Sequence, residues 1–122
     1  MFNLNILLVD DDVRTRQTVR MMLSEINEGQ VFEQADGNEA LDFLDKGSMP
    51  VDLVISDWNM PNKTGFEFLR ETRQVFPSLP FIMITARADV NSVKEALGAG
   101  VTAYIRKPFS VDELQEKISA IM

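Results

Sequence analysis

The sequence predicts an α/β fold in which helices cover both faces of a single parallel sheet. Five short apolar runs alternate with segments whose apolar residues recur at helical spacing, the pattern of repeated strand–helix units. Most runs are continuously apolar, as expected for strands buried on both faces. The connections between elements are short, and right-handed crossovers place helices on both sides of the sheet. A chain of 122 residues with these features fits one domain with a single core.

The predicted strands are the apolar runs of strand length. In chain order they are Leu4–Val9, Gln30–Gln34, Val51–Ser56, Pro80–Thr85 and Thr102–Ile105.

The predicted helices lie between and after these strands. Two of them show apolar residues at i, i+3 or i+4 and i+7. These residues are Val19, Met22, Leu23 and Ile26 in the first helix, and Val111, Leu114, Ile118 and Ile121 in the last.

Helix starts are marked by residues that cap free backbone N–H groups. Asp36, Thr64 and Ser110 are each followed three positions later by Glu, the spacing of a capping box. Asp12 is interpreted as the cap of the first helix and Asp89 as the cap of the fourth. The fourth helix is expected to end at Gly98-Ala99-Gly100.

Composition excludes several kinds of chemistry. The chain has no Cys and no His, so thiol nucleophiles, Cys-based metal sites and His-containing triads are excluded. The net charge of −7 disfavours direct binding to nucleic acid. No apolar run approaches the length of a membrane span, and the N-terminus does not resemble an export signal. We therefore expect a cytoplasmic protein without membrane insertion.

Charged and hydroxyl side chains follow the predicted strands. Asp10 and Asp11 follow the first strand, Asp57 the third and Lys107 the fifth, while Thr85 ends the fourth. In parallel sheets of this kind, ligands bind beyond the carboxyl ends of the strands, so these residues are predicted to form one site.

Oxygen ligands without His or Cys favour Mg²⁺ as the occupant of this site. A Lys ammonium and a Thr hydroxyl beside the metal suit a phosphoryl group, so one carboxylate is interpreted as a phosphoryl acceptor. Neither GxxxxGK[ST] nor GxGxxG occurs in the chain, which favours a protein or a small phosphodonor over a nucleotide.

Four motifs in this order and spacing resemble the receiver domains of two-component response regulators, with the greatest similarity to those of chemotaxis. The motifs are Leu8-Val9-Asp10-Asp11, Ser56-Asp57-Trp58-Asn59-Met60-Pro61, Ile84-Thr85-Ala86 and Tyr104-Ile105-Arg106-Lys107-Pro108-Phe109. The resemblance covers essentially the whole chain. It implies a flavodoxin-like sheet of strand order 2-1-3-4-5 and a single receiver domain over residues 1–122 without an output domain.

The resemblance also implies roles for individual residues. Asp57 would accept a phosphoryl group from a sensor histidine kinase. Lys107 would contact the phosphoryl oxygens beside a cis Lys107–Pro108 peptide, and Thr85 and Tyr104 would form the switch. Mg²⁺ would be bound by Asp11, Asp57 and the backbone carbonyl of Asn59, with Asp10 acting through water.

The same resemblance implies an output surface formed by the fourth helix, fifth strand and fifth helix. A monomer would then relay the signal to a downstream protein, for which the flagellar motor switch is a candidate. Trp58 and Asn62 are interpreted as loop and surface residues without chemistry of their own.

Three positions differ from the family pattern. Thr64 stands before Gly65 where an Asp is common, and it caps a helix almost as well. Arg87 replaces an acid two residues after Thr85 and is expected to alter the lifetime of the acyl phosphate. Asp89-Val90 replaces basic residues found in motor-binding members, which disfavours a motor partner.

Alternatives remain open at this stage. Within the same class, the chain could be a phosphorelay intermediate or the receiver of a longer regulator. A different class is a Mg²⁺-dependent aspartyl phosphatase, but such enzymes carry an acid two residues after the nucleophile, where this chain has Asn59. A phosphate-independent interaction domain is a third alternative, disfavoured by the complete set of acids, Thr and Lys.

Overall fold

The computed structural model describes residues 1–87 and 89–122. Its five strands form one parallel sheet in the order β2-β1-β3-β4-β5, which confirms the order implied by the resemblance. The strands are β1 (Ile6–Val9), β2 (Val31–Gln34), β3 (Leu53–Asp57), β4 (Phe81–Thr85) and β5 (Ala103–Arg106).

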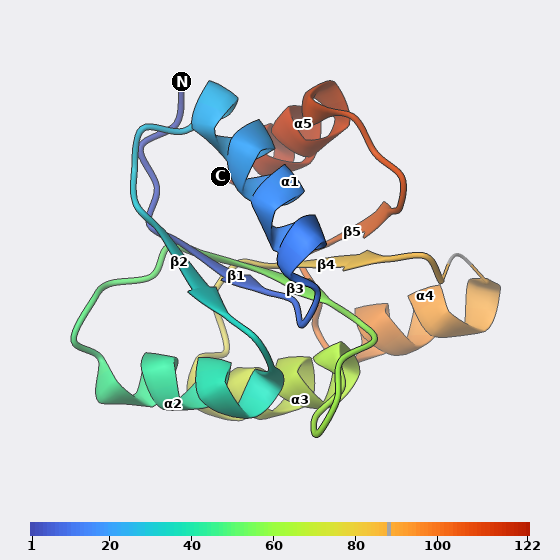
Figure 1. Ribbon diagram of the computed structural model, residues 1–122. Helices are drawn as coiled ribbons and strands as arrows, with labels where there is room; N and C mark the ends of the chain where they lie inside the picture. The colour runs from blue at the N-terminus through green and yellow to red at the C-terminus, as the bar shows by residue number, and fades with distance from the viewer. Residues whose placement is uncertain (88) are drawn as a thin grey trace.

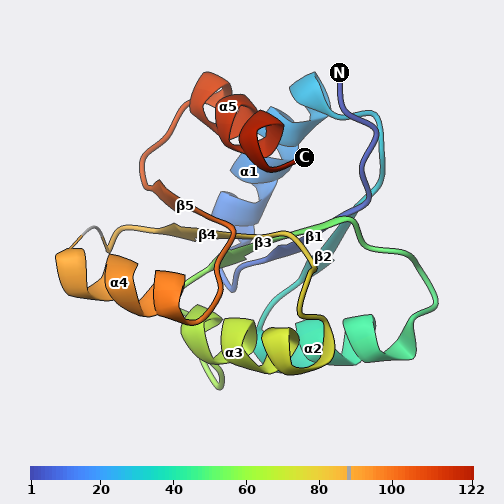
Figure 2. The ribbon, with the colours of Figure 1, turned by 180° about the vertical axis from the view of Figure 1, so that it is seen from behind.

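Helices cover both faces of the sheet, as predicted. Helices α1 and α5 lie on one face and α2, α3 and α4 on the other (Figures 1 and 2). The helices are α1 (Val13–Ile26), α2 (Gly37–Lys46), α3 (Gly65–Val75), α4 (Val90–Gly98) and α5 (Val111–Ile121). Among the described residues, no helix combines the length and apolar character needed to cross a membrane.

The strands begin one or two residues later than predicted. Before β1, side chains replace part of the backbone ladder. Asn27 accepts the N–H of Leu4 at 2.8 Å and donates to the Leu4 carbonyl at 3.0 Å. Asp52 likewise accepts the N–H of Asn5 at 2.8 Å. These side-chain bonds satisfy backbone groups next to β1 without extending the strand.

The predicted helix caps are present. The side chains of Asp12, Asp36, Asp89 and Ser110 each accept a backbone N–H in the first turn of a helix. A reciprocal capping box is present at α3, where Thr64 and Glu67 each accept the other's backbone N–H. Helix α4 ends at Gly98, as predicted, and Gly100 follows with a φ of 92°.

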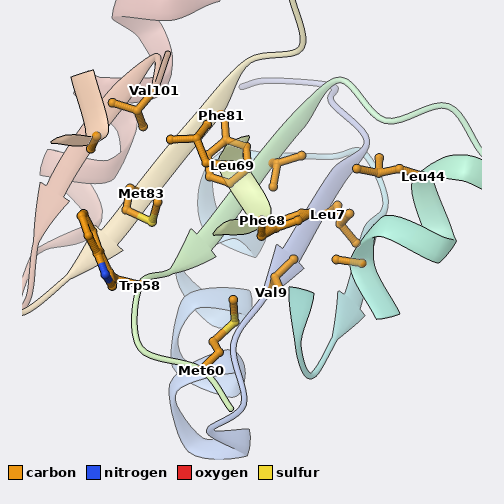
Figure 3. Close-up of a cluster of buried hydrophobic side chains, with 13 residues drawn as sticks. Leu7, Val9, Leu44, Trp58, Met60, Phe68, Leu69, Phe81, Met83 and Val101 are labelled. Carbon is orange, nitrogen blue, oxygen red and sulfur yellow. The ribbon is translucent and has the colours of Figure 1, made fainter. Parts of the chain in front are cut away.

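The core consists of two layers, one on each face of the sheet. Alternate strand residues point to opposite faces, so Leu7 and Val9 pack towards α2 and α3 while Ile6 and Leu8 pack towards α1 and α5. Figure 3 shows the first layer, in which Phe68 of α3 and Phe81 of β4 lie with ring centroids 5.3 Å apart. The two buried layers hold the carboxyl ends of the strands in a fixed position.

Candidate functional site

The carboxyl ends of four strands bring together the residues that the sequence singled out. Asp10 follows β1, Asp57 is the last residue of β3, Thr85 is the last residue of β4, and Lys107 follows β5. Pairing of β1 with β3, β3 with β4, and β4 with β5 places these four positions at one edge of the sheet.

Three carboxylates form the centre of the site. One oxygen each from Asp10, Asp11 and Asp57 lies within 4.8 Å of the others. Asp10 is only 4% exposed, Asp57 is half-buried and Asp11 is exposed. Three acids this close, two of them withdrawn from water, repel one another unless a cation neutralises them.

Lys107 provides part of that neutralisation. Its Nζ lies 3.3 Å from Oδ1 of Asp57 and 3.6 Å from Oδ2 of Asp10. Backbone N–H groups provide two further contacts: Trp58 donates to Asp57 and Asp12 donates to Asp10, each at 2.9 Å.

Lys107 neutralises only part of the charge of three carboxylates, and the pKa values of Asp57 and Asp10 are both raised. Burial raises the pKa of Asp57, and Lys107 opposes the rise without cancelling it. Burial also raises the pKa of Asp10, with repulsion from Asp57 and Asp11 acting in the same direction. The site therefore carries uncompensated negative charge.

This donor set fits a hard divalent cation. It offers carboxylate oxygens, contains no sulfur or imidazole, and has an excess of negative charge that a cation would relieve. Asn59 lies two residues after Asp57, in the loop that follows β3, and is exposed.

Thr85 and Lys107 are linked through the backbone. The Lys107 N–H donates to the carbonyl oxygen of Thr85 at 2.9 Å, and the Lys107–Pro108 peptide is cis, as expected. Thr85 is fully buried, and its Oγ1 accepts the N–H of Arg87 at 3.0 Å. A hydroxyl that accepts from the backbone keeps its own proton to donate.

Arg87, in the loop after β4, also contacts the loop after β3. The sequence did not reveal these contacts. Its guanidinium carbon lies 5.2 Å from the centre of the Trp58 ring, and Nη2 donates to Oδ1 of Asn59 at 3.3 Å. Its backbone carbonyl accepts a hydrogen bond from the hydroxyl of Tyr104. Arg87 therefore links the loop after Asp57 to Thr85 and Tyr104.

The interpretation of Trp58 as a surface residue was wrong. Its side chain is 4% exposed, stacks on Phe66 with ring centroids 5.6 Å apart, and meets the edge of Tyr104 at 6.4 Å. The indole follows Asp57 directly in the chain and packs against Tyr104, the predicted switch residue. Sequence spacing gave no signal for this burial, because Phe66 and Tyr104 come from different elements.

Gly65 is a site residue that sequence reasoning named only as the neighbour of Thr64. A Cβ built on Gly65 would lie 2.0 Å from the carbonyl oxygen of Asp57. The Gly65 N–H donates to the carbonyl oxygen of Trp58 at 2.7 Å. The start of α3 therefore packs directly under the backbone of Asp57, and a glycine directly after the cap Thr64 was the available signal.

Comparisons with known proteins agree with this geometry. The family model of the response regulator receiver domain matches residues 6–119. Chemotaxis protein CheY-3 of Vibrio cholerae serotype O1 is 40% identical over 121 residues, which cover 98% of this chain and 92% of that protein. Chemotaxis protein CheY of Pseudomonas aeruginosa is 38% identical over 120 residues, covering 97% of this chain and 95% of that protein.

Solved structures show the same fold. The structure of chemotaxis response regulator CheY4 of Vibrio cholerae at low pH matches with a TM-score of 0.89 and 32% identity, over 98% of this chain and 99% of that chain. The signal receiver domain of an HD domain-containing protein from Pseudomonas fluorescens matches with a TM-score of 0.87 and 29% identity, over 98% of this chain and 94% of that chain.

Proposed function

Since the chain belongs to the response regulator receiver domain family, a family of two-component signalling proteins, we propose that it is a phospho-acceptor switch acting through Asp57. The observation that carries this proposal is the contact of one ammonium, that of Lys107, with two of three clustered carboxylates. A cluster held at strand ends by two buried core layers is suited to positioning a reacting group.

The proposed reaction transfers a phosphoryl group from a phosphohistidine of a sensor kinase to Asp57. A carboxylate oxygen of Asp57 forms a bond to phosphorus, the P–N bond breaks, and its electron pair passes to the imidazole nitrogen. Hydrolysis reverses the modification when water attacks phosphorus and the Asp57 oxygen leaves. The chain therefore changes its own state and is not a conventional enzyme with a separate substrate.

Each of the other site residues has a proposed role. Mg²⁺, bound by Asp11, Asp57 and the Asn59 carbonyl with Asp10 acting through water, would neutralise charge on the phosphoryl oxygens. After phosphorylation, the Lys107 ammonium gives up its contact with the Asp57 carboxylate and contacts the phosphoryl oxygens. Thr85 donates a hydrogen bond from its hydroxyl to the phosphoryl group.

We propose that the switch reaches the surface through Arg87 and Tyr104. Movement of Thr85 towards the phosphoryl group would strain its bond to the Arg87 N–H, and Arg87 also holds the Tyr104 hydroxyl. The surface of α4, β5 and α5 would then change and favour a downstream protein partner.

The similarity to chemotaxis proteins of Vibrio cholerae and Pseudomonas aeruginosa supports a role in chemotaxis or motility. The similarity to the receiver domain of an HD domain-containing protein supports a second candidate, a receiver that serves a larger regulator. A phosphorelay intermediate is a further alternative of the same class. A pull-down with phosphorylated and unmodified protein separates the two: a motor component retained only by the phosphorylated form supports chemotaxis.

An aspartyl phosphatase is less well supported. Asn59 occupies the position at which such an enzyme carries an acid, and its side chain is engaged with the Arg87 guanidinium. An amide cannot transfer the proton that a leaving alcohol requires.

The proposal is tested by phosphorylation with a small donor. In the presence of Mg²⁺ and acetyl phosphate or phosphoramidate, intact-protein mass spectrometry should show one added phosphoryl group that is stable in acid and labile in base. Asp57→Ala should abolish it, whereas Asp45→Ala, which removes an exposed acid of α2, should not. An undiminished adduct in Asp57→Ala would exclude Asp57 as the acceptor.

Lys107→Ala separates the roles of ammonium and metal. It should slow phosphorylation strongly while changing Mg²⁺ affinity little, because Lys107 is not among the proposed ligands. Loss of Mg²⁺ binding in this variant would contradict the assignment of roles.

Arg87 is predicted to alter the lifetime of the acyl phosphate, because its guanidinium lies over Trp58 and holds the Asn59 side chain. The acyl phosphate of Arg87→Ala should decay at a rate that differs severalfold from that of the parent protein. The decay is followed by mass spectrometry after removal of the phosphodonor. Arg70→Ala provides a matched control, because Arg70 is an exposed arginine of α3 whose guanidinium lies 6.0 Å from the centre of the Phe66 ring. Equal decay rates in Arg87→Ala and the parent would contradict the prediction.

A further inference from the structure

We propose that Asn62 and Asp36 are positioning residues that hold the loop after Asp57 in a metal-binding conformation; this rests on the proposed Mg²⁺ site. Asn62 lies in the loop between β3 and α3, and Asp36 is the N-cap of α2. Nothing in the family motifs assigns either residue to the site.

The loop contains a tight backbone turn at Asn62. The Lys63 N–H donates to the Pro61 carbonyl oxygen at 2.7 Å, and Asn62 between them has a φ of 68°. This is a γ-turn with a positive central φ, a rare and strained form. Asn62 is the only residue other than glycine with a positive φ in the described part of the chain. Such a conformation persists only where surrounding contacts hold it.

The Asn62 side chain supplies one such contact. Its Nδ2 donates to Oδ2 of Asp36 at 3.2 Å, while Oδ1 of Asp36 accepts the Glu39 N–H at 2.9 Å. The same carboxylate therefore caps α2 and binds the loop. These hydrogen bonds favour the ionised carboxylate and lower the pKa of Asp36.

A second contact lies next to the first. Lys63 forms an ion pair with Glu71 of α3, and its aliphatic stem would lie 3.0 Å from a Cβ built on Gly37, at the start of α2. The turn therefore fits between the start of α2 and the face of α3.

The γ-turn influences the orientation of the Asn59 carbonyl, because it holds one end of the loop that contains Asn59. Trp58 and Met60 are buried, whereas Asn59 between them is exposed. The Asn59 carbonyl is therefore oriented by the segments on either side of it. On one side Asp57 is fixed in β3, and on the other the γ-turn begins at Pro61. Release of the turn from Asp36 would allow the Asn59 carbonyl to reorient, which would weaken a metal site that uses it.

The inference is tested with a double-mutant cycle. Asn62→Gly removes the side chain but tolerates the positive φ. Asp36→Ser keeps an N-cap hydroxyl for the Glu39 N–H but removes the second oxygen. The readout is Mg²⁺ affinity, measured by the fluorescence of Trp58, the single tryptophan of the chain, and independently by the rise in melting temperature with Mg²⁺.

Each single variant should bind Mg²⁺ about two- to fivefold more weakly, the low end of the net effect of one hydrogen bond, because this contact acts on the metal only through the loop. The double variant should bind no more weakly than the weaker single variant, because both changes remove the same contact. Asp45→Ser, with the same charge change on an exposed position of α2, should bind as the parent does.

Unchanged affinity in both single variants, or losses that multiply in the double variant, would overturn the inference. If the parent binds Mg²⁺ and is phosphorylated but the variants match it, this inference alone fails. If the parent neither binds Mg²⁺ nor accepts a phosphoryl group, the proposed function fails with it.

Discussion

Asp10 illustrates how a single residue can oppose stability while serving a site. It is nearly fully buried, its pKa is raised chiefly by that burial, and Asp57 and Asp11 add repulsion. Lys107, 3.6 Å away, does not offset these effects. The folded protein therefore holds an ionised acid that it would hold more easily as a neutral group.

We predict that Asp10→Asn stabilises the metal-free protein by about 1 kcal/mol, an ordinary size for a single substitution, because it removes a buried negative charge. The amide oxygen can still accept the Asp12 N–H, so only the charge is lost. The measurement is urea unfolding in EDTA and again in Mg²⁺, where the variant should gain less from the metal than the parent. Asp45→Asn, at an exposed position, is the control and should change neither quantity. Destabilisation by Asp10→Asn in EDTA would mean that the ion pair with Lys107 outweighs burial.

At the scale of elements, the start of α3 is the part of the fold that fits the site most closely. The capping box of Thr64 and Glu67 fixes where the helix begins. Gly65 then lies against the backbone of Asp57, where a side chain has no room. The position of the acceptor residue therefore depends on a helix start that carries no charged site residue.

We predict that Gly65→Ala destabilises the protein by about 1–3 kcal/mol, the usual cost of forcing extra atoms into a packed site. It should also slow phosphorylation of Asp57, because the displaced backbone carries the acceptor. Gly98→Ala is the matched control, because Gly98 is the last residue of α4 and a Cβ built on it meets nothing within 4 Å. The stability of this variant should be unchanged or slightly higher. Thermal unfolding and the rate of adduct formation check both variants, and similar behaviour of the two would contradict the close fit.

At the scale of the whole molecule, acid has two opposite effects on stability. Burial raises the folded pKa of Asp10 and Asp57, so the metal-free fold gains stability as pH falls through those raised values towards 3.8, the ordinary pKa of Asp. The net charge of −7 also declines towards zero near the sequence pI of about 4.5, which reduces self-repulsion. Hydrogen bonds from the first turns of the helices lower the folded pKa of the caps Asp12, Asp36 and Asp89. The stability that these three caps contribute is complete above pH 3.8. It is lost as the pH falls through their lowered pKa values.

We therefore predict that metal-free stability rises from neutral to mildly acidic pH and falls again below about pH 4. Chemical unfolding in EDTA across this range measures the curve. Asp10→Asn should flatten the rise but leave the acid limb unchanged, because the caps are intact. A monotonic loss of stability from pH 7 downwards would show that the site acids do not control this range.

The local parts of the molecule were determined by sequence alone. Strand and helix order, the caps at Asp12 and Thr64, and the end of α4 at Gly98 follow from apolar spacing and backbone hydrogen bonding within a few residues. The meeting of Asp10, Asp57, Thr85 and Lys107 also followed, because parallel strands align their carboxyl ends.

Only the tertiary structure decided how those residues are supported. Burial of Trp58 depends on Phe66 and Tyr104, the contact of Arg87 with Asn59 joins two loops, and the bond from Asn62 to Asp36 spans 26 positions. Such contacts leave no periodic signal, because each depends on side-chain packing between elements distant in sequence. The chemistry of the site was thus readable from residue types at strand ends, whereas the orientation of its loops was set by packing in three dimensions.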